Sequence, residues 1–381
     1  MPVFLEGKSE KKVEYLELIY DLIFVYIIGR NNSLLHFLEN GFIRPEAFVT
    51  YLLTSLIVLQ IWYYSTLFIN RYGTNGTSEH IATFINMYLL YYMADGTRLH
   101  WQALYGRYNF AWGLILLNLA AQYWLKYRRS GGLMPWENAH QRFNVRLLLV
   151  QAGIVFLSIP LYAVTGLPLS PVALVAGLAA ALLRRETNRL VSVDFPHLTE
   201  RVMLYVVFTF GEMIIGIAGY FTGGVTPRSV YFSLMAFLIV AGLFASYGFV
   251  YNHLIDREQK TTGTVYMLLH IFLIAALNNI TVALEFMQEP EVAVVPKHLF
   301  LVLSLIAYFA FLFALEKFAV VRLEKSRPFC LRLAAAFLLF LLLMGLLYPY
   351  PAVSIGLTVA FIYSLYLLIW LQWRRLRLYE D

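Results

Sequence analysis

Long apolar runs, separated by short polar stretches, recur along the whole chain. A helix needs about 20 mostly apolar residues to cross the hydrocarbon core of a bilayer. We therefore predict a membrane helix in each of twelve segments: 16–38, 48–70, 79–99, 107–125, 143–165, 168–184, 199–221, 228–252, 264–286, 298–320, 331–348 and 352–372. Segment 168–184 is short and begins among prolines, so whether it crosses the bilayer fully is left open.

The spacing of the apolar residues favours helices over strands. Residues 337–347 read FLLFLLLMGLL, without the two-residue alternation of a membrane β-barrel strand. In lipid, every backbone polar group needs a partner, and a helix supplies these partners within one segment. The pattern therefore predicts an all-α polytopic membrane protein with about twelve transmembrane helices.

Composition supports the same class. Of the 381 residues, 60% are hydrophobic and 14% are charged, against about 45–50% and 25% in soluble domains. These values exclude a soluble enzyme with a conventional solvated surface. The single cysteine, Cys330, cannot form an intramolecular disulfide. The sequence has no nucleotide-binding glycine loop and its scattered histidines lack metal-ligand spacing, so we expect no cofactor, no metal site and no ATP-driven pump.

The net charge of +6 indicates membrane orientation rather than nucleic-acid binding. If both termini are cytoplasmic, the inner loops hold 23 of the 29 basic residues and Arg30 lies inside a span. The outer loops then hold only Arg44, Arg98, Arg107, Arg228 and Lys297. This asymmetry follows the positive-inside rule. It predicts cytoplasmic termini, membrane lipids as partners and no nucleic-acid partner.

Polar segments 126–142 and 185–198 are the longest connections, and the second separates six predicted spans from six. We therefore predict two halves, 1–190 and 191–381, within one membrane domain. YDLIFVYIIG at 20–29 resembles FTFGEMIIG at 208–216, as expected for parallel repeats of a transporter. The alternative is that aromatic membrane helices resemble one another by composition alone.

Ionisable residues within membrane spans are energetically costly and therefore mark candidate functional sites. Glu14, Glu17 and Asp21 lie on one face of the first predicted helix. Carboxylates stacked in this way favour the binding of a proton. The alternative is ordinary solvation at the cytoplasmic interface, which applies more to Glu17 than to the deeper Asp21.

Arg30 lies deeper in the same predicted span and needs a counter-ion from another helix. Glu212 and Asp95 are the candidates, because both lie in predicted spans at a similar depth. Gly211 and Gly216 flank Glu212 and would allow a neighbouring helix to approach closely. Such a pair could belong to a transport pathway or could be purely structural.

In the predicted ninth span, His270 and Asn278 are eight residues apart and lie near one stripe of the helix. A proton relay or polar substrate path would need such a stripe. The alternative for His270 is a hydrogen bond between helices.

Four stretches resemble the bacterial low temperature requirement A (LtrA) family. EYLELIYDLIFVYIIG (14–29) resembles the family's first-span signature, and QIWYYSTLFINRYGTNGTSEHIATFINMYLLYYMAD (60–95) its second and third spans. HLTERVMLYVVFTFGEMIIGIA (197–218) is similar to its HxxER segment, and VYMLLHIFLIAALNN (265–279) to its histidine-bearing late span. The residues on motif positions are Glu17, Asp21, Asn70, Arg71, Glu200, Arg201, Gly211, Glu212 and His270.

The chain departs from the family pattern at Thr74, Asn75 and Gly76, where acidic residues are common. The resemblance implies a multi-spanning protein of the bacterial inner membrane, linked by name to growth in the cold. It implies no agreed reaction.

Three functions follow as hypotheses. A secondary, proton-coupled transporter of a small solute is favoured by the buried carboxylates and the twelve-span plan. The alternatives are a structural or sensory membrane protein in cold adaptation, and a membrane-embedded lipid-handling enzyme with the carboxylates and His270 as acid-base groups. The sequence names neither the solute nor the oligomeric state.

Overall fold

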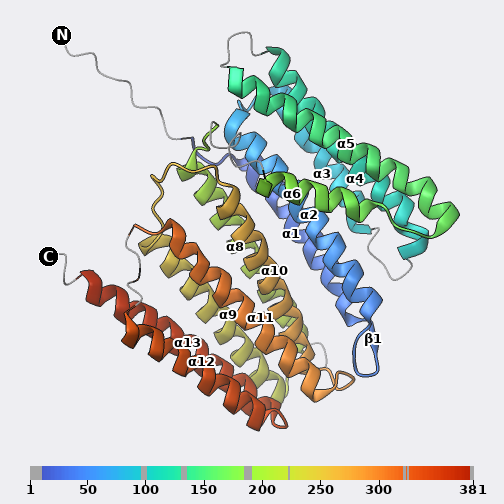
Figure 1. The fold of residues 1–381 in the computed structure, drawn as a ribbon. Coiled ribbons are helices and arrows are strands. Elements are labelled where there is room, and N and C mark those ends of the chain that lie inside the picture. The colour runs from blue at the N-terminus through green and yellow to red at the C-terminus, as the bar shows by residue number, and fades with distance from the viewer. Residues whose placement is uncertain are drawn as a thin grey trace, which may run out of the picture. The chain divides into compact units, whose positions relative to one another are not determined.

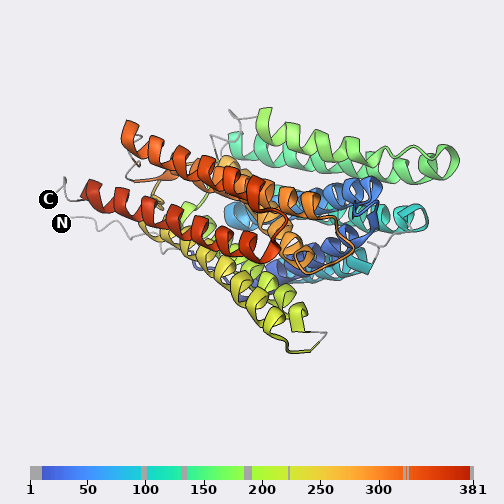
Figure 2. The same cartoon turned by 90° about the horizontal axis from the view of Figure 1, so that it is seen from below.

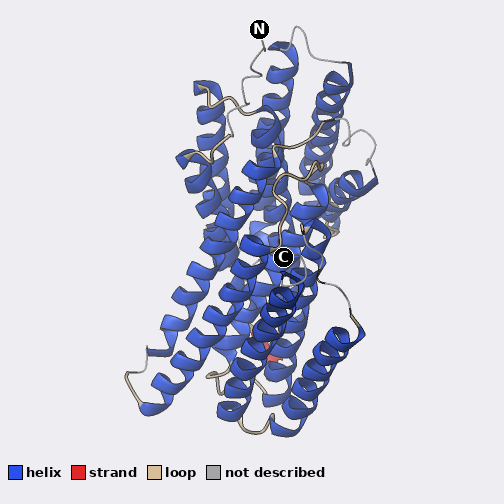
Figure 3. Cartoon of the chain, turned by 90° about the vertical axis from the view of Figure 1, so that its left-hand side faces the viewer, coloured by secondary structure: helices blue, strands red, loops and turns tan. Residues whose placement is uncertain are grey.

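The apolar runs form helices almost throughout the computed structural model, which describes residues 11–95, 101–129, 135–183, 191–221, 224–320, 323 and 326–377 (Figure 3). Within these ranges there are twelve α-helices, labelled in Figure 1: α1 Tyr15–Asn32, α2 Pro45–Tyr72, α3 Thr77–Asp95, α4 Trp101–Arg129, α5 Pro135–Thr165, α6 Ser170–Leu183, α8 Phe195–Ala218, α9 Pro227–His253, α10 Thr264–Phe286, α11 Val294–Ala314, α12 Arg327–Leu347 and α13 Pro351–Arg377. Three short 3-10 helices accompany them: η1 Ser33–His36, η2 Gly219–Phe221 and η3 Leu315–Phe318. Each of the twelve predicted segments overlaps one of the α-helices.

Eight of the described helices are long and apolar enough to cross a membrane: α2, α5 and α8 to α13. The chain is therefore a polytopic all-α membrane protein. The other four are α1, α3, α4 and α6. α1 carries Glu17, Asp21 and Arg30, and α6 has only 14 residues. A 14-residue helix rises about 21 Å, which is less than the thickness of about 30 Å of the hydrocarbon core.

The first predicted span, 16–38, is wrong at its end. α1 stops at Asn32, and a two-residue antiparallel hairpin follows η1, with β1 Leu38–Glu39 paired to β2 Phe42–Ile43. Its turn residues, Asn40 and Gly41, both have positive φ angles, of 52° and 79°. An Asn-Gly pair with two positive φ angles is the usual sequence of a type I′ hairpin turn. Arg30 consequently lies in the last turn of α1.

The described residues group into two compact units. Unit 1 comprises Met1–Ile27, Leu53–Tyr205 and Arg257–Met267, and unit 2 comprises Ile28–Leu52, Val206–Asp256 and Leu268–Asp381. Both units contain segments from before and after residue 190, and α1, α2, α8 and α10 contribute residues to both. The predicted sequence halves and their duplication stay predictions.

In unit 1, α4 packs against α3 and α5, and α5 packs against α6 (Figure 1). The α4–α5 contact is close because Gly113 faces a ring: a Cβ atom added there would collide with Phe156. Tyr105 of α4 stacks on Tyr162 of α5 with ring centroids 3.9 Å apart. The Tyr105 hydroxyl also hydrogen-bonds the Ser170 hydroxyl at the start of α6, at 2.9 Å. Ring packing and a buried hydrogen bond thus hold these helices together.

In unit 2, α13 packs against α12 and α9 (Figure 2). Phe340 of α12 stacks on Phe361 of α13 with centroids 4.0 Å apart. Gly242 gives α9 its close approach, because a Cβ atom there would collide with Ile362. Only 11% of the most apolar 18-residue stretch of α12 is buried within the protein. A helix that is apolar and yet exposed is suited to contact with lipid.

Candidate functional site

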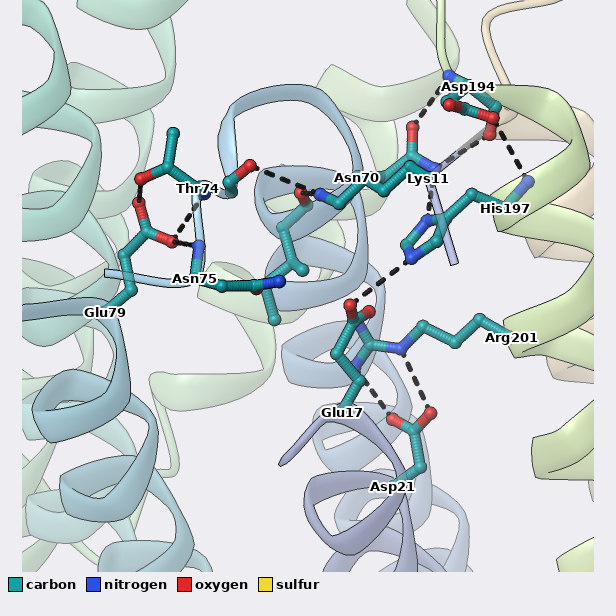
Figure 4. A network of polar contacts seen from close by, with 12 residues as sticks. Lys11, Glu17, Asp21, Asn70, Thr74, Asn75, Glu79, Asp194, His197 and Arg201 are labelled. Atoms are coloured by element: carbon teal, nitrogen blue, oxygen red, sulfur yellow. Dashed lines mark hydrogen bonds and ion pairs between the residues drawn. The ribbon is translucent and has the colours of Figure 1, made fainter. Parts of the chain in front are cut away.

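Two carboxylates of α1 and one guanidinium of α8 form a buried cluster in unit 1 (Figure 4). Arg201 donates from Nε to Oδ2 of Asp21 at 3.0 Å and from Nη2 to Oδ1 at 2.9 Å. Its Nη1 donates to Oε2 of Glu17 at 2.8 Å. Asp21 and Arg201 are 0% exposed and Glu17 is 3% exposed. We call these three residues the ionic centre.

Helix geometry explains why these side chains meet. Glu17 and Asp21 are four residues apart, so their side chains lie on one face of α1. Asp21 lies six residues after the first residue of α1, and Arg201 six residues after the first residue of α8. Six residues rise about 9 Å in each helix. The two side chains therefore reach the same depth when the helices start at the same level.

An indole completes the contacts of Asp21. Trp62 of α2 donates from Nε1 to Oδ1 of Asp21 at 3.0 Å, and its ring stacks on Tyr205 with centroids 4.5 Å apart. Each oxygen of Asp21 and Glu17 thus accepts at least one hydrogen bond, since His197 supplies the remaining one. Buried carboxylates need such partners, because an unpaired buried charge costs several kcal/mol.

The start of α8 supplies a second layer of contacts. Asp194 precedes α8, and its side chain accepts a hydrogen bond from the backbone N–H of His197 at 3.1 Å, as an N-cap residue does. Asn70 of α2 binds the backbone of Asp194 in both directions, accepting at 3.0 Å and donating at 2.8 Å. The Asn70 amide therefore has a fixed orientation.

That orientation assigns the proton of His197. The Asn70 amide nitrogen lies 2.9 Å from Nδ1 of His197, which must therefore accept. Nε2 then carries the hydrogen and donates to Oε1 of Glu17 at 3.3 Å. His197 is neutral in this arrangement. The ionic centre therefore has two negative charges, on Glu17 and Asp21, and one positive charge, on Arg201. The neutral His197 adds no charge to it.

Lys11 lies next to this layer, before α1 begins. Its Nζ donates to the carbonyl oxygens of Ile69 at 2.5 Å and Gly73 at 3.3 Å, which neutralises the C-terminal end of α2. Burial lowers the pKa of the Lys11 ammonium below its ordinary value of 10.5, and the nearby Glu17 opposes that shift. Lys11 thus adds positive charge near the centre without an ion pair to it.

A family model described as bacterial low temperature requirement A protein (LtrA) matches residues 12–364. The chain belongs to the LtrA family. The match covers nearly the whole chain, which confirms the resemblance seen in the four sequence motifs. A comparison with curated proteins found no match.

The LtrA motif residues separate into distinct places. Glu17, Asp21, Asn70 and Arg201 belong to one connected network. Arg71 lies beside it in unit 1, where Nη1 contacts Nε2 of His140 at 3.1 Å and Nη2 donates to the carbonyl of Thr262 at 2.9 Å. Glu200 is exposed and lies outside the network.

The turn after α2, where the sequence departs from the LtrA pattern, is held by one carboxylate. Glu79 accepts from the backbone N–H of Thr74 at 2.7 Å and of Asn75 at 3.0 Å. Asn75 has a positive φ of 55°, a conformation that asparagine tolerates better than most residues. Glu79 therefore stabilises this turn locally.

The predicted ion pair of Arg30 with Glu212 is wrong. Arg30 is exposed, and none of the ion pairs among the described residues joins it to Glu212. The physical reason is the early end of α1: in its last turn Arg30 reaches the surface and needs no buried counter-ion, since a cation is favourable there. The other candidate, Asp95, ends α3, and its side chain lies outside the described residues.

Only one of the two glycines near Glu212 allows the close approach of a neighbouring helix that the sequence predicts. Gly216 faces α10 closely, because a Cβ atom there would collide with Thr281 and Glu285. Gly211 faces open space. Glu212 itself lies against Gly29 of α1, within unit 2, where any larger residue would displace its carboxylate.

His270 and Asn278 lie in unit 2 and bond between helices. Nε2 of His270 lies 3.2 Å from the Tyr247 hydroxyl of α9. Asn278 accepts from Asn32 of α1 at 3.4 Å and donates to the carbonyl of Ile274 at 2.9 Å. These contacts fit the alternative of hydrogen bonds between helices, and a proton path along this stripe stays a prediction.

Sequence reasoning missed three partners of the carboxylates: Trp62, His197 and, as an ion-pair partner, Arg201. A signal for two of them exists, because His197 and Arg201 are four residues apart and share one face of α8. No comparable signal singles out Trp62 among the seven tryptophans.

Proposed function

We propose that this LtrA protein is a secondary, proton-coupled carrier of a small solute, and that the ionic centre is its coupling element. The observation that carries the proposal is the unequal charge of the centre, where two buried carboxylates share one buried guanidinium. A proton is the smallest partner that can balance the second carboxylate. Intramembrane carboxylates of proton-driven transporters serve in this way.

The coupling acts through the contact between α1 and α8. With both carboxylates ionised, Arg201 holds the two helices by three hydrogen bonds. A proton on Asp21 weakens two of them, because a neutral carboxyl group attracts the guanidinium less than a carboxylate does. Protonation therefore loosens the α1–α8 contact, and loss of the proton tightens it, which gives two states whose balance a proton gradient can shift.

We also propose a topology for the carrier. All twelve described α-helices cross the bacterial inner membrane, α6 with local thinning of the bilayer, and both termini are cytoplasmic. The support for this plan is the distribution of the basic residues, with 23 in the inner loops and 5 in the outer loops. The predicted parallel halves belong to the same proposal.

The decisive experiment measures solute-driven proton movement. The purified protein is reconstituted in liposomes that contain a pH-sensitive dye, and amino acids, sugars, organic anions and organic cations are added class by class under an imposed pH gradient. At least one class is expected to drive proton movement. Asp21→Asn should keep the fold and abolish the pH dependence, since asparagine preserves size and hydrogen bonding but does not titrate.

Glu17→Gln should have a milder effect, and Glu39→Gln is the matched control, because Glu39 is an exposed carboxylate in the hairpin. An Asp21→Asn protein with wild-type flux and wild-type pH response would make Asp21 structural. Absence of proton movement for the wild type in every class would remove the carrier proposal itself.

One observation favours a structural or sensory role as the second candidate. All four oxygens of Glu17 and Asp21 already accept hydrogen bonds, so the centre could serve only to fix α1 against α8. In that case substitutions at the centre would lower thermal stability, while the wild-type protein would move neither protons nor solute.

A further inference from the structure

A half-open cavity of about 490 Å³ lies within unit 2, and no residue of the ionic centre lines it. It is formed by η1, the ends of α8 and α10, and the start of α9, and the side chains that define its chemistry are His36, Tyr220, Arg228, Glu285, Gln288 and Glu289. Its volume is within the range of about 300–1,000 Å³ that is usual for small-molecule sites.

One carboxylate is held in place at the wall of this cavity. Oε2 of Glu285 lies 2.8 Å from Nε2 of His36. Its other oxygen lies over Gly216, where a Cβ atom would collide with it. The edge of the His36 ring also packs on Phe286, with centroids 5.4 Å apart. Glu285 is therefore positioned by a glycine on one side and by a histidine on the other.

Acidic groups outnumber permanent cations around the cavity. Glu289 follows Glu285 by four residues, just beyond the end of α10, and also lines the cavity. Glu212 lies one turn before Gly216 on α8 and interacts electrostatically with Glu285. Among the described residues, the ion pair at this cavity joins Glu285 to His36, whose positive charge is lost at high pH.

The basic side chains near the cavity have other contacts. The guanidinium of Arg228 lies over the ring of Phe232, 5.7 Å from its centroid. Lys297 donates to the carbonyl oxygens of Phe286 at 3.3 Å and Glu289 at 3.1 Å, which neutralises the C-terminal end of α10. Thr226 and Ser229 bind each other in the capping box of α9. The cavity therefore offers negative charge to a ligand.

We propose that this cavity binds a small organic cation, whose positive group replaces His36 at the Glu285 carboxylate. A carboxylate and the ring of Tyr220 are suitable partners for an alkylammonium group. The volume exceeds what a single metal ion needs, and no three described His, Cys, Asp or Glu side chains are grouped so that they could hold one. The claim that organic cations are the substrates of the carrier rests on the proposed function. The claim that the cavity binds them does not.

The test uses the full chain in detergent and permanently charged probes, tetramethylammonium and choline, which have no neutral form. Thermal unfolding is recorded against probe concentration, with sodium chloride at equal ionic strength. We expect the probes to raise the Tm and sodium to leave it unchanged. Binding should strengthen as pH rises, since deprotonated His36 no longer competes for Glu285.

Two variants of the cavity test it independently. Glu285→Gln removes the charge and should weaken probe binding at least about tenfold, and Gly216→Ala should weaken it by displacing the same carboxylate without a change of charge. Glu39→Gln is the matched control and should bind normally. Equal stabilisation by sodium, preferential stabilisation by acetate, or unchanged binding by Glu285→Gln would overturn the proposal.

The outcomes separate this site from the carrier. Because binding is measured without a gradient, probe binding without uptake into liposomes retains the site and rejects transport of organic cations. Proton movement driven by another solute class, together with no probe binding, rejects the site and retains the carrier.

Discussion

Arg201 is the residue on which the ionic centre depends, because its guanidinium binds both carboxylates. Its planar fork binds the two oxygens of Asp21 and one oxygen of Glu17 at the same time. A lysine ammonium has the charge but not this geometry. Removing one member of a buried ionic cluster leaves the charges of the remaining members uncompensated. This costs more free energy than replacing all members with neutral residues.

Replacement of Arg201 by Gln is therefore expected to destabilise the protein by about 3–5 kcal/mol. Arg201→Lys should have a smaller effect, and the triple change to Gln at 17, Asn at 21 and Gln at 201 should recover part of the loss. Chemical or thermal unfolding in detergent measures these differences. Arg44→Gln, at an exposed pair with Glu39, is the control and should change stability by no more than about 1 kcal/mol. An Arg201→Gln protein as stable as this control would contradict the prediction.

His36 contributes to the stability of the folded protein in a pH-dependent way, and the sign of this contribution follows from its pKa. It is the last residue of η1, outside the eight candidate spans, and the hydrogen bond with Glu285 raises the pKa of its imidazole, with support from the charges of Glu285 and Glu289. A raised pKa in the folded state stabilises the protein below the ordinary value of about 6.5 and loses that effect as pH rises through the raised value. The Tm difference between wild type and His36→Gln should therefore be larger at pH 5 than at pH 9. A difference that grows with pH would refute this assignment.

The residues of the centre show how far sequence reasoning reaches. Glu17 and Asp21 were predicted, together with Glu14, to share one face of the first helix because of their spacing, which is a local relation. Their partner Arg201 comes from a helix 180 residues away in the chain, and no local period encodes that contact. The predicted pairing of Arg30 with Glu212 is wrong because the depth of Arg30 was inferred from a helix that was assumed to continue to residue 38.

At the scale of elements, helix positions follow directly from the apolar runs, since lipid requires hydrogen bonding within each segment. Helix ends follow less directly. α1 ends early because residues 33–38, which are apolar enough to be read as helix, form the 3-10 helix η1 and the approach to the hairpin with its Asn-Gly turn. Close contact between helices depends on individual small residues, which the apolar pattern does not reveal.

The α4–α5 contact provides a matched test of such a residue. Gly113→Ala should destabilise the protein by about 1–3 kcal/mol, because the new methyl group collides with the ring of Phe156. Gly153→Ala on α5 faces open space and should be neutral or slightly stabilising, since alanine is the better helix former. Unfolding of the two purified variants in detergent compares them. Equal stability would show that α4 and α5 can separate without cost.

At the scale of the whole molecule, the distribution of positive charge carries the proposed orientation. A fluorescent reporter fused after Asp381 should be active, as expected for a cytoplasmic end, and alkaline phosphatase at the same position should be inactive. Alkaline phosphatase inserted in the acidic loop between α10 and α11 should be active, because this loop is expected outside. Active phosphatase after Asp381 would exclude the proposed cytoplasmic C-terminus.

Trp62 links the ionic centre to an optical signal. Its indole donates to Asp21 and stacks on Tyr205, so a change in the charge of Asp21 alters the electric field at a buried fluorophore. Emission that changes with pH in the wild type and not in Trp62→Phe would report this titration without any added label. The same tryptophan could then time the loosening and tightening of α1 against α8 in stopped-flow experiments, before any solute is identified.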